Sequence, residues 1–333
     1  INCKENFQFI SPFFTYFSAP GTYWMKNTRF CVWMREETLF MLTIRTDLAM
    51  EAHQLWREKA GETTKLSGVS AREEELEGFP LTRVEILDQE GETALGKPRG
   101  TYLTLDVSAL WRREEDVFLR AVRAVAELLE PLLPERGPVL AAGLGNPAMT
   151  ADALGPRMLD HLLVTRHLTE VLPGFRSVAG LGAGVLGSTG MEAAEWVRGA
   201  ADHVKPAAVV VVDALAARSL DRLCSSIQIS DTGLIPGSGV GNHRLALNAA
   251  GLGVPVISVG VPTVVSVETA ARDLLAQAGG DEEKIPDLEG KGLFVTPDSI
   301  DSKVRELAKV IGYGVDMALQ PGLEVEDLEA LLA

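Results

Sequence analysis

Two aspartates follow apolar runs that have the composition of buried strands. Asp213 comes directly after residues 207–212, and Asp152 lies in the loop that leaves residues 139–142. Because ligands gather at the carboxyl ends of parallel strands, the two carboxyls could meet at one sheet edge and hold a water molecule. One would then act as general base and the other as general acid. The alternative is structural, with each aspartate capping the helix that follows it.

Other chemistry-bearing patterns are weaker. The GxGxxG run at 182–187 lacks an acidic residue about 20 positions later, so a tight turn is favoured over a nucleotide site. Ser238 stands in Gly-Ser-Gly-Val-Gly, which is not the GxSxG pattern of a serine nucleophile. Cys224 has no signature of a reactive thiol and is expected to be a small buried residue. The five histidines (His53, His161, His167, His203 and His243) form no metal-binding pair of the HExxH kind.

Alternating apolar runs and amphipathic stretches predict the elements that position these residues. The pattern is that of an α/β fold, with a mostly parallel central sheet flanked by helices and a small β-rich addition at its N-terminal end. The polar stretch 61–78 is expected to be loop or flexible edge. The predicted strands are 81–87, 101–105, 139–142, 176–178, 207–212 and 255–259, and the predicted helices are 114–130, 191–204, 267–278, 304–319, 325–332 and one from about Leu154.

Composition narrows the function classes. The chain has 31 Lys and Arg against 46 Asp and Glu, a net charge of −15, which argues against a protein that binds nucleic acid through phosphate contacts. No apolar run approaches the roughly 20 residues of a membrane-spanning helix. The three cysteines form neither a disulfide framework nor a zinc pattern, so a reducing cytoplasmic compartment is expected.

The first 33 residues differ from the rest. They hold 10 of the 20 aromatic residues and two of the three cysteines. We expect residues 1–33 to be a non-native or disordered extension, with Met34 as the natural start. A real, poorly ordered arm is the alternative.

Several runs together resemble the germination protease of spore-forming bacteria. The resemblance extends from about Arg45 to Leu319, and it implies a fold similar to that of hydrogenase maturation proteases. It also implies an endopeptidase that starts the degradation of small acid-soluble spore proteins, works as a homotetramer in the spore core, and has its two essential aspartates at Asp152 and Asp213. The runs are 143–156 (GLGNPAMTADALGP), 163–168, 212–218, 227–233, 236–242, 254–257 and 260–265.

The resemblance further implies a zymogen that cleaves itself. The run Arg-Thr-Asp-Leu-Ala-Met-Glu at 45–51 matches the family's self-cleavage segment, which predicts cleavage between Asp47 and Leu48. The propeptide would then be 34–47, and 48–333 would form a single α/β peptidase domain. A natural mechanism is that the segment keeps the carboxyl site occupied or misarranged until the spore core acidifies and dehydrates.

Two alternatives remain open. Related maturation proteases bind a metal at the matching acidic positions, so a divalent ion could activate the water. No third ligand is apparent, and we expect no cofactor. The opening Gly-Leu-Gly-Asn-Pro at 143–147 also occurs in peptidyl-tRNA hydrolases, but the charge of −15 fits a nucleic-acid partner badly. Compared with the family, the segment 279–292 is short and acidic, which leaves the tetramer contacts or substrate access open.

Overall fold

The computed structural model describes residues 46–60, 66–112, 114–171, 173–238, 244–280, 285 and 292–332. All of them belong to one compact unit, residues 44–333. The predicted extension 1–33 and all of the predicted propeptide except Thr46 and Asp47 lie outside the described residues. None of the described helices has the length and hydropathy needed to cross a membrane.

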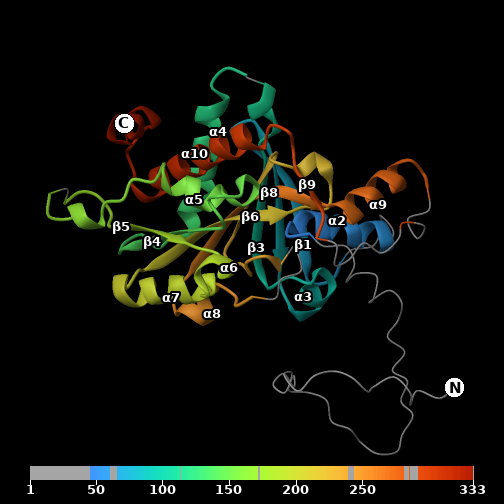
Figure 1. Cartoon of the computed structure of the whole chain (residues 1–333), viewed down its shortest axis with the longest axis horizontal. Coiled ribbons are helices and arrows are strands. Elements are labelled where there is room, and N and C mark those ends of the chain that lie inside the picture. Colours follow the sequence, from blue (N-terminus) through green and yellow to red (C-terminus); the bar gives the residue numbers. More distant parts are fainter. Residues whose placement is uncertain are drawn as a thin grey trace, which may run out of the picture. The chain divides into compact units, whose positions relative to one another are not determined.

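In the described part of this unit, one mixed sheet of nine strands forms the centre (Figure 1). The strand order is β1-β2-β3-β7-β8-β6-β4-β5, and β9 pairs with β8. The bounds are β1 Val69–Leu76, β2 Phe79–Ile86, β3 Gly100–Asp106, β4 Val139–Leu144, β5 Val178–Ala183, β6 Ala208–Ala216, β7 Ser226–Ser230, β8 Val256–Ser266 and β9 Phe294–Val295.

The predicted α/β class is confirmed, with a parallel part and an antiparallel part in the same sheet. Strand β4 pairs in parallel with β5 and β6, and β6 pairs in parallel with β8. The predicted β-rich addition, β1 to β3, extends this sheet because β3 pairs with β7 and β7 with β8, both antiparallel. Of the four parallel strands, β4, β6 and β8 contain nearly all of the apolar runs predicted as strands, whereas β5 shares only Val178 with the predicted strand 176–178.

Helices cover both faces of the sheet (Figure 1). Helices α4, α5 and α10 lie on one face, and α7 and α8 lie on the other (Figure 1). The bounds are α2 Ala49–Ala60, α3 Gln89–Leu95, α4 Val117–Leu129, α5 Leu154–Leu159, α6 Leu186–Thr189, α7 Ala193–Val204, α8 Ala249–Leu252, α9 Val267–Gln277, α10 Ile300–Leu319 and α11 Val325–Leu332.

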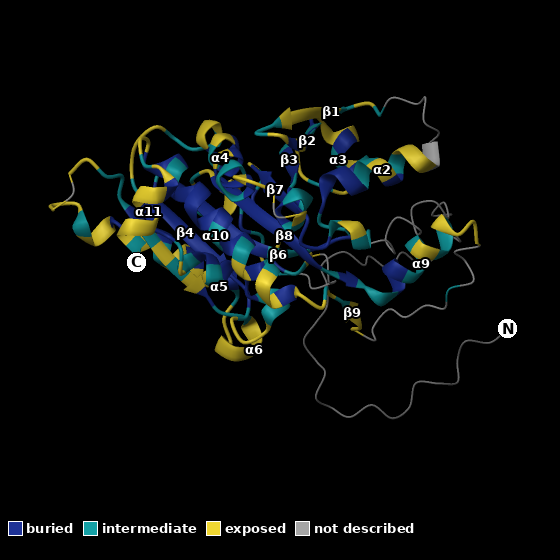
Figure 2. Ribbon diagram, turned by 90° about the horizontal axis from the view of Figure 1, so that it is seen from above, coloured by how far each residue is buried: buried dark blue, intermediate teal, exposed yellow. Residues whose placement is uncertain are grey.

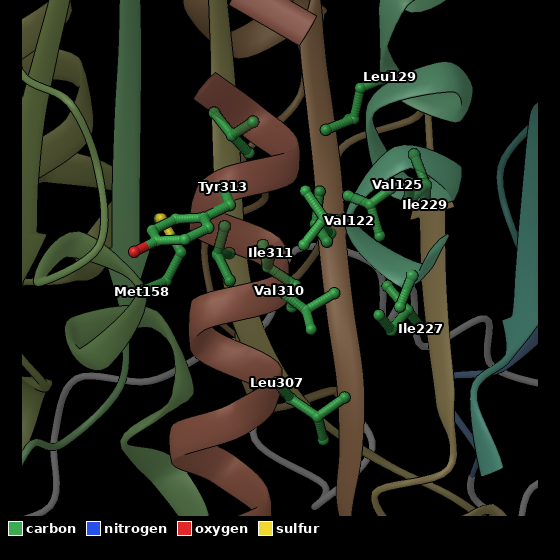
Figure 3. Close-up of a cluster of buried hydrophobic side chains, with 14 of the residues drawn as sticks. Val122, Val125, Leu129, Met158, Ile227, Ile229, Leu307, Val310, Ile311 and Tyr313 are labelled. Atoms are coloured by element: carbon green, nitrogen blue, oxygen red, sulfur yellow. The ribbon is translucent and has the colours of Figure 1, made fainter. Parts of the chain in front are cut away.

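The core explains why the central strands are apolar without alternation. In β6, Val210 and Val212 pack toward α4 and α10, whereas Val209 and Val211 pack toward α7. Figure 3 shows the first of these layers, in which side chains of α10 and α4 meet those of β7. Strands β4 and β7 are buried from end to end and β6 and β8 along most of their length, whereas the outer faces of the helices are exposed (Figure 2).

Strand β1 is not among the predicted strands. Residues 69–76, expected to be loop or flexible edge, form the edge strand β1, which pairs with β2 along its whole length. Four of its consecutive side chains, from Arg72 to Glu75, are charged and exposed, so the residues lack the apolar alternation on which the strand predictions relied. Backbone pairing needs no apolar side chain, and charged residues are typical of edge strands.

Candidate active site

Asp213 lies within a strand rather than after its end. Strand β6 continues to Ala216, while its pairing with β4 stops at Val212. The carboxyl of Asp213 is buried, and its Oδ1 accepts a hydrogen bond from the Ala214 N–H at 2.9 Å. The helix-cap alternative for Asp213 is therefore wrong, because this strand continues through it.

Asp152 reaches the same place from the loop after β4. Its Oδ2 accepts a hydrogen bond from the Asn146 N–H at 2.9 Å, and no side chain caps α5, whose preceding residue is Ala153. The carboxyl therefore fastens the start of its own loop instead of capping the helix. A hydrogen bond of 2.6 Å from Thr263 Oγ1 to the Ala151 carbonyl ties the loop to β8.

Glycines allow this close approach. A Cβ at Gly155 would lie 2.4 Å from the Leu144 backbone and 2.5 Å from the Val212 carbonyl oxygen. Gly145 has φ +111°, and a Cβ there would lie 2.0 Å from the Asp152 carbonyl oxygen. The two glycines thus let the loop and α5 sit directly on the ends of β4 and β6, which brings Asp152 to Asp213.

The two carboxyls, called the aspartate pair below, affect each other electrostatically. Burial raises the pKa of Asp213 well above its usual range, and the charges of Asp152 and then Asp47 raise it further. Burial also raises the pKa of Asp152. The Arg244 guanidinium opposes both increases in pKa. A close pair of this kind keeps a proton at a pH where exposed carboxyls have lost theirs.

The predicted cleavage segment lies against the end of β6. A bulge between Leu215 and Ala216 turns the strand away from regular pairing with β8. The Asp47 N–H donates to the Ala216 carbonyl at 2.9 Å, and the Ala216 N–H donates to Asp47 Oδ2 at 2.9 Å. Ser238 Oγ donates to Asp47 Oδ1 at 2.7 Å. The acidic side chain before the predicted cleavage point therefore has two dedicated donors.

Two side chains hold the carbonyl oxygen of Asp47, the acceptor atom of the predicted scissile bond. Lys97 Nζ donates to it at 2.9 Å, and Gln228 Nε2 donates to it at 3.1 Å. Gln228 Oε1 also accepts from the Ala49 N–H at 2.8 Å. One amide group thereby binds the backbone on both sides of Leu48, which is completely buried together with Ala49.

The remaining residues of the segment are held as well. The Glu51 carboxylate is buried and accepts hydrogen bonds from the N–H groups of Arg218 at 2.8 Å and Ser219 at 2.9 Å. Thr46 Oγ1 donates to Glu51 Oε2 and accepts from the Leu48 N–H at 3.0 Å. The segment is thus fixed at Thr46, Asp47, Leu48, Ala49 and Glu51.

A row of three neighbouring residues, one on each of β7, β8 and β6, lies between the segment and the aspartate pair. Gln228 on β7 and Asp213 on β6 are both register partners of Gly260 on β8, so the three residues face the same side of the sheet. A Cβ at Gly260 would lie 2.5 Å from Cγ and Cδ1 of Leu215. The Leu215 side chain therefore occupies the space above Gly260, between Gln228 and Asp213.

The donor set fits a metal ion poorly. Among the described residues, no group of three or more His, Cys, Asp and Glu side chains is arranged to hold one. Near the aspartate pair, the Asp47 carboxylate is already engaged by Ala216 and Ser238. The described residues at this site therefore do not provide the ligand set of a metal centre.

The other sequence candidates have structural explanations. Cys224 is buried, as predicted, with its pKa raised by burial to about 11. Residues 182–187 run from the end of β5 into the short helix α6. His243 lies outside the described residues.

Sequence reasoning missed four residues that contact or separate the parts of the site, namely Lys97, Leu215, Gln228 and Ser238. Gln228 lies between two isoleucines, but its strand β7 was not predicted, so its burial could not be read from the sequence. Ser238 lacks the sequence pattern of a serine nucleophile, and its hydroxyl instead binds Asp47. Lys97 and Leu215 carried no local signal.

Comparisons with known proteins place the chain in a family. The family Peptidase_A25, described as germination protease, matches residues 49–277. Germination protease of Caldanaerobacter subterraneus subsp. tengcongensis is 42% identical over 327 residues, covering 88% of this chain and 99% of the relative. Germination protease of Clostridium perfringens is 38% identical over 326 residues, covering 88% and 100%.

The likeness to a solved structure is weaker. A [NiFe] hydrogenase maturation protease, HycI from Thermococcus kodakarensis, aligns with a TM-score of 0.33 at 20% identity, covering 56% of this chain and 98% of HycI. That score is too low to support any detail of the site. The sequence relatives are decisive, and the chain belongs to the germination protease family of endopeptidases.

Proposed function

We propose that this endopeptidase degrades small acid-soluble spore proteins during germination, and that it is made as a precursor that cleaves itself between Asp47 and Leu48. Asp152 and Asp213 activate the attacking water. One observation carries the proposal: a buried carboxyl on β6 and a half-buried carboxyl from the loop after β4 interact, so that the charge of Asp152 adds to the effect of burial in raising the pKa of Asp213 well above its usual range. The substrate class follows from the family to which the chain belongs.

The raised pKa values give the pair its chemistry. With one proton shared between them, one carboxyl is ionised and can accept a proton from water, while the other can donate a proton to the departing amide nitrogen. Because Asp213 is the more buried carboxyl and also experiences the charges of Asp152 and Asp47, it is the better candidate for the protonated partner. Burial in a low-dielectric environment strengthens the electrostatic effect of both charges on Asp213.

The bound segment supports self-processing in particular. Each residue of 46–51 except Met50 has a specific polar or fully buried environment, which is what a substrate-binding site provides. The predicted cleavage point lies in the middle of this run, where Asp47 binds Ala216 and Ser238 on one side and Leu48 is buried on the other. The chain's own segment thus has the contacts expected of a bound substrate.

Leu215 keeps the precursor inactive in this proposal. Its side chain lies between Gln228, which binds the Asp47 carbonyl, and Asp213. The carboxyls reach the scissile carbonyl only when this side chain turns away. In the precursor the segment is therefore bound, but its scissile carbonyl is kept apart from the catalytic carboxyls. This agrees with the expectation that the segment keeps the site misarranged.

Assembly and location are also proposed from the family. We expect a homotetramer that acts in the spore core, without a direct nucleic-acid partner. Light scattering of the purified protein tests the assembly, and a monomeric mass in the active fraction would contradict it.

The activity is tested with a purified small acid-soluble spore protein as substrate. The processed enzyme should cleave it, and Asp152→Asn and Asp213→Asn variants that fold normally should be inactive. Each substitution should lower the rate about 10²–10⁴-fold, the usual contribution of a catalytic acid or base. Full activity in either variant would overturn the mechanism, and loss of activity after exhaustive chelation would favour the metal alternative.

A further inference from the structure

The carbonyl oxygen of Asp47 is bound by donors that the aspartate pair does not supply. Lys97 Nζ lies 2.9 Å from it and Gln228 Nε2 lies 3.1 Å from it. Both donors are already within hydrogen-bond distance of the ground-state carbonyl oxygen, and an oxyanion site needs donors about 2.7–3.1 Å from the position that this oxygen takes in the transition state. A cation and a neutral amide donor converging on one main-chain carbonyl are more than is needed to satisfy a single backbone acceptor.

Each donor is held in place by further contacts. Lys97 Nζ also donates to the Thr46 carbonyl at 3.3 Å, so it spans two successive carbonyls of the segment. The Gln228 amide is oriented by the Ala49 N–H, which donates to its Oε1 at 2.8 Å and thereby turns Nε2 toward Asp47. Neither amide orientation nor lysine position depends on the aspartate pair.

We propose that Lys97 and Gln228 form the oxyanion-binding half of this peptidase, polarising the Asp47 carbonyl and holding the negative charge that develops on its oxygen during self-cleavage. The inference rests on the proposed self-processing and names two catalytic residues beyond the aspartates. In this mechanism the aspartate pair transfers protons, whereas Lys97 and Gln228 stabilise the negative charge on the carbonyl oxygen.

Self-cleavage proceeds through a tetrahedral intermediate that forms and then collapses. The water oxygen bonds to the Asp47 carbonyl carbon as one carboxylate of the aspartate pair takes the water proton, and the carbonyl π electrons move to the oxygen bound by Lys97 and Gln228. When this intermediate collapses, the bond from carbon to the Leu48 nitrogen breaks. Its electron pair stays on that nitrogen, which receives a proton from the other carboxyl. The products are the Asp47 carboxyl group and the Leu48 amine.

The electrostatics of Lys97 agree with this role. Burial lowers its pKa, while the charges of Asp47 and Glu51 raise it in opposition. A weakly solvated ammonium beside a carbonyl oxygen interacts more strongly with developing charge than a hydrated one does.

The test follows the first-order rate of self-cleavage of the full precursor by mass spectrometry. Lys97→Met removes the charge at nearly unchanged length. Gln228→Glu keeps an acceptor for the Ala49 N–H but replaces the donor that faces Asp47. Each variant should slow cleavage about 10²–10³-fold. Lys205→Met and Gln89→Glu, both at exposed positions, are the matched controls and should cleave at the unchanged rate.

Rescue separates catalysis from folding. Lys97→Arg, which restores a cationic donor, should recover at least tenfold over Lys97→Met. Added methylammonium should accelerate a Lys97→Ala precursor but not a Gln228→Glu precursor. Circular dichroism and thermal melting establish that the variants compared are folded.

The outcomes are distinct. If the unmodified precursor cleaves itself but both Lys97→Met and Gln228→Glu cleave at its rate, the oxyanion assignment is wrong and the aspartate mechanism stands. If both are slow but neither Lys97→Arg nor methylammonium restores cleavage, the two residues are structural and the assignment is also wrong. If the unmodified precursor does not cleave itself, the proposed function fails first.

Discussion

Gln228 and Asp213 face the same side of the sheet as the two register partners of Gly260, and the Leu215 side chain fills the space between them. A residue with a side chain at position 260 would collide with Leu215. Gln228, which holds the Asp47 carbonyl, is therefore separated from Asp213 by one leucine side chain. This relationship leads to the first prediction.

Leu215→Ala should accelerate self-cleavage. Removing the separating side chain opens the path from the aspartate pair to the Asp47 carbonyl, and each 1.4 kcal/mol removed from the barrier gives about a tenfold higher rate. We expect at least about a tenfold increase in the first-order rate, with stability lowered by about 2 kcal/mol because Leu215 is only partly buried. Leu220→Ala, which truncates a leucine packed against the same apolar cluster, is the control. A slower or unchanged rate in a folded Leu215→Ala precursor would refute the separating role.

Asp213→Asn should make the protein more stable at neutral pH while abolishing cleavage. The folded-state pKa of Asp213 is raised, so its contribution to stability is fully present below about pH 4 and is lost as pH rises through the folded-state pKa. Asparagine removes this penalty. The melting temperature should rise by about 2–4 °C for each kcal/mol relieved, and the difference from the unmodified protein should shrink at acidic pH. A lower melting temperature at pH 7 would contradict the assigned burial of charge.

Asp316 should make stability depend on pH away from the active site. Burial raises its pKa to about 8, although the Leu163 N–H donates to both carboxyl oxygens at 2.9 and 3.1 Å. In the interval between about pH 4 and 8 the folded state binds one more proton than the unfolded state does. Unfolding free energy should therefore fall with rising pH, by at most about 1.4 kcal/mol per unit from this group.

Denaturant titrations across that pH interval measure the slope. Asp316→Asn keeps an acceptor for Leu163 and should flatten the curve, whereas Asp202→Asn, at an exposed position of α7, should not. Equal slopes for the unmodified protein and Asp316→Asn would show that Asp316 is not the responsible group.

Ser238→Ala should slow self-cleavage about tenfold. Its hydroxyl donates to Asp47 Oδ1 at 2.7 Å, and a hydrogen bond to a charged group is worth about 1.5–3 kcal/mol, reduced here because Ser238 is exposed. The rate is measured by mass spectrometry, with Ser302→Ala on α10 as the control. An unchanged rate would mean that the Ala216 N–H alone recognises the acidic side chain.

Much of the fold could be predicted because its central strands are buried on both faces. Residues 207–212 and 255–259 read as continuous apolar runs, and both are parallel strands of the sheet. Strand β1 was missed because its side chains are charged, and β7 because a five-residue strand with an internal glutamine gives little signal. Local composition indicates which residues are buried, whereas β1 and β7 are strands because their backbones pair with neighbouring strands.

Some residues of the site could likewise be predicted from the sequence, and others could not. Asp152, Asp213, Asp47 and Leu48 lie in runs whose spacing and family resemblance identified them, and the structure brings them into one region. Gln228 and Leu215 are brought together by register between strands that are not adjacent in the sequence, and no spacing rule specifies that β7 and β6 flank β8. Lys97 reaches the segment from the connection between α3 and β3. The same register could not have been derived before the sheet order was known.

The central claim is that Asp152 and Asp213 together cleave the bond between Asp47 and Leu48. Mass spectrometry of the purified precursor, incubated at mildly acidic pH beside its Asp152→Asn and Asp213→Asn variants, tests it most directly. We predict that the unmodified chain loses everything up to Asp47 and begins at Leu48, while both folded variants keep their full mass. Cleavage at that bond in either variant, at the rate of the unmodified protein, would contradict the account.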